Sequence, residues 1–140
     1  MVLLLGLLCF GAIAQSKPDS QPVITIKRET SLGCSPDYSA EIYRDGTVIY
    51  HGVACVKISV DAVDQLIKAF DQANYFSFKD AYEFDEHGIS YTDLARTTTS
   101  ISINGKHKQV VDYLNPLKKL VALEAAIEKL AALYQYIGPL

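Results

Sequence analysis

The chain has 140 residues, of which 49% are hydrophobic and 21% are charged, and its formal net charge is -3 at pH 7. This length suits one ordinary domain, and this composition excludes a disordered or fibrous chain. The mild acidity and the scattered basic residues argue against a nucleic-acid binder, which needs a basic surface to neutralise phosphates.

The N-terminus predicts export. Residues 2–14 form an uncharged, largely apolar run that ends in Ala12-Ile13-Ala14, the small-x-small pattern of a signal peptidase site. The run is too short to span a bilayer comfortably, because a transmembrane helix needs about 20 apolar residues. No Lys or Arg precedes it, and a buried core helix is the alternative interpretation. We expect a signal peptide over residues 1–14, cleavage between Ala14 and Gln15, and no membrane span afterwards.

The mature chain begins with a polar leader over residues 15–22, and we expect a single domain over residues 23–137. The first strand is expected over residues 23–28, where β-branched residues are frequent. A hairpin follows over residues 38–50, because Asp45-Gly46 separates two alternating runs and is typical of a two-residue type I′ turn.

The register of this hairpin decides which side chains share a face. A two-residue loop makes Ile42 face Ile49 across the strands, and Tyr43, Val48 and Tyr50 then project from the opposite face. If helices cover one face only, these three residues form a candidate binding surface, because tyrosine offers a large contact area at low entropic cost. The alternative is that they pair across the strands and only stabilise the sheet.

Two helices and a second hairpin complete the domain. Ser59 is a typical N-cap for a helix whose apolar side chains recur at helical spacing: Val63, Leu66, Ile67 and Phe70. Asn104-Gly105 predicts a tight hairpin over residues 97–113. Asn115-Pro116 is typical of a helix start, and Gly138-Pro139 of a helix end.

These elements predict an α+β fold in the order β-ββ-α-ββ-α. We expect an antiparallel sheet built from two β-hairpins plus the N-terminal strand, with two helices packed on one of its faces.

Two cysteines remain once the signal peptide, which contains Cys9, is removed. An even number in an oxidising compartment favours a disulfide between Cys34 and Cys55, and neither residue belongs to a zinc-binding Cys-x-x-Cys pair. In the predicted register the two residues are displaced by two positions from direct opposition at the hairpin base. We expect the irregular loop around Cys34 to close that gap.

The acidic segment over residues 82–93 leaves two interpretations open. Its polar side chains could gather around a cation: Glu83, Asp85, Glu86, His87 and Asp93. The spacing lacks the pattern of a calcium loop, and a solvated acidic loop is the simpler interpretation. The sequence contains no helical zinc motif, nucleophile elbow or phosphate-binding glycine loop. We therefore expect no catalytic residues, cofactor or metal.

Several segments, in order along nearly all of the mature chain, carry a resemblance to a known family. They are residues 24–26, 35–39, 42–50, 74–80, 91–94, 97–101 and 110–113. These segments resemble domain of unknown function 6438, a bacterial family found on exported proteins, and the resemblance implies no particular activity. The family pattern Cys-x-Gly-x-Cys-Pro-x-Tyr corresponds to residues 31–38, where serine occupies both cysteine positions and Cys34 precedes the second.

We therefore expect a non-catalytic exported module, periplasmic or extracellular, that binds an unidentified ligand or envelope protein or stabilises an assembly. The alternative is a small metal-dependent or hydrolase-like enzyme that uses His87 and the nearby carboxylates.

Overall fold

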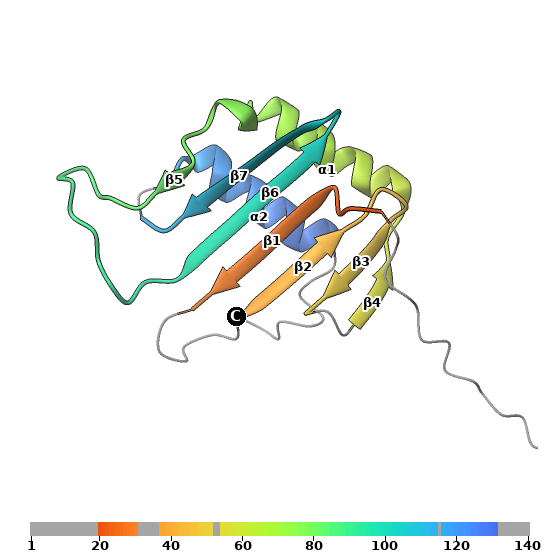
Figure 1. Ribbon diagram of the computed structural model, residues 1–140, viewed down its shortest axis with the longest axis horizontal. Helices are drawn as coiled ribbons and strands as arrows, with labels where there is room; N and C mark the ends of the chain where they lie inside the picture. Colours follow the sequence, from red (N-terminus) through yellow and green to blue (C-terminus); the bar gives the residue numbers. More distant parts are fainter. Residues whose placement is uncertain (1–19, 31–36, 52–53, 115, 132–140) are drawn as a thin grey trace, which may run out of the picture.

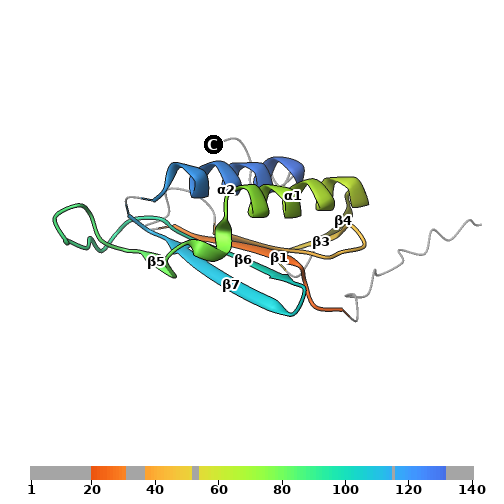
Figure 2. The same cartoon turned by 90° about the horizontal axis from the view of Figure 1, so that it is seen from above.

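The computed structural model describes residues 20–30, 37–51, 54–114 and 116–131. The predicted signal peptide and most of the polar leader lie outside these ranges. The strands are β1 (Ile24–Glu29), β2 (Tyr38–Ile42), β3 (Thr47–Tyr50), β4 (Ala54–Lys57), β5 (Ala81–Tyr82), β6 (Arg96–Ile103) and β7 (Lys106–Asp112). The helices are α1 (Val60–Gln72), the 3-10 turn η1 (Tyr75–Ser77) and α2 (Lys118–Leu130). Both α-helices pack on the same face of the sheet (Figures 1 and 2).

The strands form one mixed sheet in the order β4-β3-β2-β1-β6-β7-β5. Strand β1 lies at its centre and pairs antiparallel with both β2 and β6, whereas β5 pairs with β7 in parallel. The predicted α+β class is confirmed, but the purely antiparallel sheet and the predicted element order are wrong. The prediction missed the short strands β4 and β5, which have four and two residues; two residues are too few for a periodic pattern.

The first hairpin has a three-residue loop instead of the predicted two-residue loop. The backbone N–H of Gly46 donates to the carbonyl of Tyr43 at 3.0 Å, and the N–H of Tyr43 donates to the carbonyl of Thr47 at 2.8 Å. Gly46 has a φ of 85°. This arrangement is a tight turn followed by a left-handed residue, which an Asp-Gly sequence suits equally well.

The loop length shifts the predicted register by one residue. Ile42 pairs with Val48, and Ala40 pairs with Tyr50. Because side chains alternate along a strand, the shift moves every residue of β3 to the other face. Val48 and Tyr50 therefore lie in the core, whereas the prediction placed Ile49 there.

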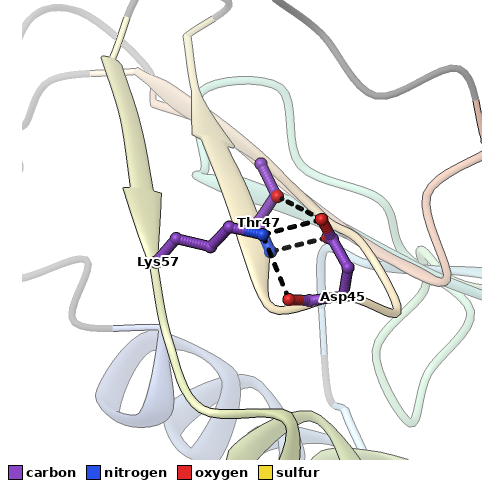
Figure 3. Close-up of polar contacts among 3 residues, drawn as sticks. All are labelled: Asp45, Thr47 and Lys57. Atoms are coloured by element: carbon purple, nitrogen blue, oxygen red, sulfur yellow. Dashed lines mark hydrogen bonds and ion pairs between the residues drawn. The ribbon is translucent and has the colours of Figure 1, made fainter. Parts of the chain in front are cut away.

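The carboxylate of Asp45 holds this turn against β4 (Figure 3). It accepts hydrogen bonds from the backbone N–H and the hydroxyl of Thr47, each at 2.9 Å, and from the ammonium group of Lys57 at 2.7 Å. Lys57 and then Thr47 hold the pKa of Asp45 well below its usual range, at about 2. The turn is thus shaped by a residue from a strand that follows the hairpin.

The second hairpin confirms its prediction. Ile103 pairs with Lys106 across the two-residue loop. Asn104 and Gly105 have φ values of 52° and 71°, as a type I′ turn requires.

The two helices cover the apolar face of the sheet. Ser59 caps α1 as predicted, since its hydroxyl accepts the backbone N–H of Ala62 at 3.1 Å. Helix α2 begins at Lys118, later than Pro116, and its N-cap residue Leu117 makes no side-chain hydrogen bond. The predicted cap Asn115 lies outside the described residues. The buried apolar helix residues are Val63, Leu66 and Phe70 from α1 and Leu120, Leu123 and Ile127 from α2.

Candidate functional site

A long loop over residues 83–95 connects β5 to β6 and projects beyond the end of the sheet (Figures 1 and 2). We call it the projecting loop. It exposes several large apolar side chains, with these relative exposures: Phe84 60%, Ile89 51%, Tyr91 51% and Leu94 42%. A loop of this length without regular structure is uncommon in a compact domain and usually carries a function.

The tip of the projecting loop is organised by Asp85. One carboxylate oxygen accepts the backbone N–H groups of His87 at 2.9 Å and Ile89 at 2.8 Å. The backbone of Asp85 donates to the carbonyl of Ile89 at 2.9 Å and accepts from Gly88 at 3.1 Å. Gly88 has a φ of 76°, which glycine adopts readily. The tip is therefore a closed, hydrogen-bonded turn.

The return segment of the loop is anchored by Tyr113, which follows β7. Its hydroxyl hydrogen-bonds the backbone carbonyl of Tyr91, lies 3.1 Å from the carbonyl of Thr92, and accepts the N–H of Leu94 at 3.4 Å. The guanidinium carbon of Arg96 lies 5.0 Å from the centroid of the Tyr113 ring. These contacts hold the backbone while the apolar side chains face solvent.

The acidic residues of the loop are not gathered into a metal centre. Glu83 pairs with Arg96 at 3.4 Å, and Glu86 lies 3.5 Å from His87. Across the described ranges, no three His, Cys, Asp or Glu side chains are grouped so that they could hold a metal ion. The geometry therefore does not assemble the site that the enzyme hypothesis requires.

The three residues of the predicted aromatic surface are buried. Val48 is fully buried, Tyr50 is 7% exposed, and both belong to the core under the helices. Tyr43 is also fully buried, and its hydroxyl donates to Glu41 at 2.6 Å. The one-residue register shift separates Tyr43 from the other two, so they do not form a shared exposed surface.

The disulfide between Cys34 and Cys55 stays a prediction, because Cys34 lies outside the described residues. Cys55 is paired with Ile49 of β3. Strand β3 therefore separates Cys55 from β2, and the register on which the predicted proximity was based does not hold.

A second polar feature, which the sequence analysis missed, lies beneath α2. We call it the buried carboxylate cluster: Arg28, Tyr38, Asp112, Glu124 and Glu128. Glu128 is 8% exposed, and one of its oxygens accepts hydrogen bonds from the Tyr38 hydroxyl and from Arg28, the latter at 3.3 Å. Burial and the hydrogen bond to Glu128 raise the pKa of Tyr38.

The neighbouring carboxyl pair in this cluster is Glu124 and Asp112. Burial and the adjacent carboxyl of Asp112, with which Glu124 shares a hydrogen bond, raise the pKa of Glu124 to about 8. Burial also raises the pKa of Asp112. Glu124 is 7% exposed, and its Oε1 has no hydrogen-bond partner. Such shifts occur in catalytic pairs and in structural networks alike. Because Glu124 and Glu128 are buried and interact with Asp112 and Arg28 of the sheet, we assign the cluster to docking of the helix.

The spacing of Glu124 and Glu128 in the sequence could have predicted this cluster. They are four residues apart and lie on the same side of α2 as Leu120 and Ile127, so helical spacing places them against the sheet.

Comparison with known proteins shows the family to which the chain belongs. No curated protein matches the chain. Within the described residues, no helix has the length and apolar character needed to cross a membrane. The family described as Domain of unknown function (DUF6438) matches residues 22–131, a range that includes every described strand and helix. The match confirms the resemblance found in the sequence, and the chain belongs to this family of domains of unknown function.

Proposed function

We propose that this chain is a non-catalytic module of the exported fraction, which binds a protein partner through the projecting loop. The proposal rests on a contrast within this loop between a backbone held by hydrogen bonds and apolar side chains exposed to solvent. Its backbone is held by Asp85 and Tyr113, while Phe84, Ile89 and Tyr91 remain at least half exposed. Exposed apolar side chains on an ordered frame are typical of interaction sites, since little conformational entropy is lost on binding. The predicted signal peptide supports export.

The charges of the loop indicate the chemistry of the partner. Its acidic residues are Glu83, Asp85, Glu86 and Asp93, and it contains no Lys or Arg. A complementary surface presents an apolar patch bordered by lysine or arginine side chains. Charge complementarity of this kind makes association faster at low salt.

A comparison of captured proteins tests the proposal. The tagged mature chain and the variant Phe84→Ser/Leu94→Ser are used as baits in envelope extract from the producing cells. Val60→Ser is the matched control, because Val60 is 50% exposed and lies at the start of α1, at the opposite end of the molecule (Figure 1). Quantitative mass spectrometry compares the proteins retained by the three baits.

We expect at least one protein to be retained by the wild type and by the Val60 variant, and to be lost from the loop variant. Its retention should fall as the salt concentration rises, because the loop is acidic. If the same proteins are retained by all three baits, the projecting loop is not the binding site.

A further inference from the structure

A cleft of about 370 Å³ lies between α1 and the turn end of the β6–β7 hairpin. Its apolar lining comes from both sides: Ile67 and Phe70 from α1, and Ile101 and Ile103 from β6. Phe76, which is 42% exposed, adds an aromatic ring to the lining. Small-molecule sites in proteins have volumes of about 300–1,000 Å³ and are mainly apolar with a few placed polar groups. The cleft has this size and this composition.

Two lysines line the cleft from different elements. Lys68 belongs to α1, and Lys106 begins β7 directly opposite Ile103. Both are exposed, and neither has an ion-pair partner in the part of the chain that the structure describes. The acidic residue of the lining is Asp71, so the charged side chains of the lining sum to one positive charge. The lining therefore favours an anion over a cation.

We propose that this cleft binds a small amphipathic anion. A compact apolar or aromatic body would contact Ile67, Ile101 and Phe76, and its carboxylate or sulfonate group would lie between Lys68 and Lys106. Burial of the apolar body supplies affinity, and the two lysines determine the sign of the ligand's charge. This site lies at the opposite end of β6 from the projecting loop (Figure 1), so it is independent of the function proposed above.

Two probes with the same aromatic body and opposite charges test the proposal. They are 1-naphthalenesulfonate, which is an anion, and 1-naphthylmethylammonium, which is a cation. Each is titrated into isotopically labelled mature protein, and amide chemical shifts give both the affinity and the location of binding. We expect the anion to shift the amides of Ile67, Ile101 and Ile103, and to bind at least tenfold more tightly than the cation.

Removal of the two lysine charges distinguishes binding at this site from general hydrophobic adsorption. In Lys68→Gln/Lys106→Gln the apolar lining is kept, and we expect the dissociation constant of the anion to rise at least tenfold. The exposed Lys118→Gln on α2 is the matched control and should bind the anion as the wild type does. Equal affinity for the two probes, shifts that map away from the cleft, or undiminished binding by the double variant would each overturn the proposal.

Discussion

Replacing Glu124 by glutamine should stabilise the domain at neutral and alkaline pH and change its stability little under acid conditions. In the folded chain this carboxyl keeps its proton up to about pH 8, whereas its ordinary pKa is 4.5. Between these values the unfolded chain binds fewer protons than the folded one, so the free energy of unfolding falls as the pH rises. Below pH 4.5 this carboxyl is protonated in both the folded and the unfolded chain, so the difference in bound protons vanishes.

The size of this effect follows from the two pKa values. Each pH unit between them lowers the free energy of unfolding by about 1.4 kcal/mol, which amounts to about 3 kcal/mol at pH 7. Glutamine has nearly the same shape, and its amide can donate to Asp112 in place of the carboxyl proton. At pH 7 the variant should therefore gain on the order of 10 °C in melting temperature.

Denaturant unfolding of both proteins between pH 4 and pH 8 measures this difference. The stability gained by Glu124→Gln should increase steadily from pH 5 to pH 8. Glu86→Gln is the matched control, because the Glu86 side chain is 81% exposed, and it should show no such increase. If the difference between Glu124→Gln and the wild type does not depend on pH, the raised pKa of Glu124 is refuted.

The remaining predictions concern the turns, the cysteines and the N-terminus. Gly46→Ala should lower the free energy of unfolding by at least about 2 kcal/mol, because its φ is 85° and a Cβ would lie 2.2 Å from a backbone carbonyl oxygen. Gly105→Ala, with a φ of 71° and open space around it, should lower it by about 1 kcal/mol, and thermal unfolding compares the two. Thiol titration of the non-reduced mature chain should find Cys34 and Cys55 unreactive, and reduction should lower the stability by about 3 kcal/mol; two reactive thiols would exclude the bridge. Mass spectrometry of exported protein should show Gln15 as the first residue, whereas an intact Met1 would contradict the signal peptide.

Local signals in the sequence predicted local structure well. Ser59 caps a helix and Asn104-Gly105 makes a two-residue turn, because each feature is determined by a few neighbouring residues. Asp45-Gly46 has the same local signal and gave the wrong register. Its three-residue loop places Val48 and Tyr50 in the core, and its Asp45 binds Lys57 from a strand that the sequence pattern did not predict.

The candidate sites depend on contacts that the sequence pattern does not contain. Phe84 and Leu94 are ten residues apart in an acidic segment, and both are exposed. The backbone of Leu94 is held by the hydroxyl of Tyr113, a contact between distant parts of the chain that the sequence pattern does not contain. Glu124 and Glu128 resemble a solvated helix face by residue type. Their burial is compatible with folding because the strands supply partners such as Arg28 and Asp112.

The central position of β1 has a consequence for the way in which the chain folds. Its two neighbours are far apart in the sequence. Strand β2 follows β1 directly, whereas β6 begins only at Arg96. A nascent or truncated chain that ends before β6 leaves one edge of the central strand without its partner, and such an edge can pair with other chains. Closure of the sheet also requires contacts between residues about 75 positions apart, such as the Thr25–Ser100 hydroxyl pair. Contacts of that range slow folding, which keeps the chain unfolded for longer after synthesis.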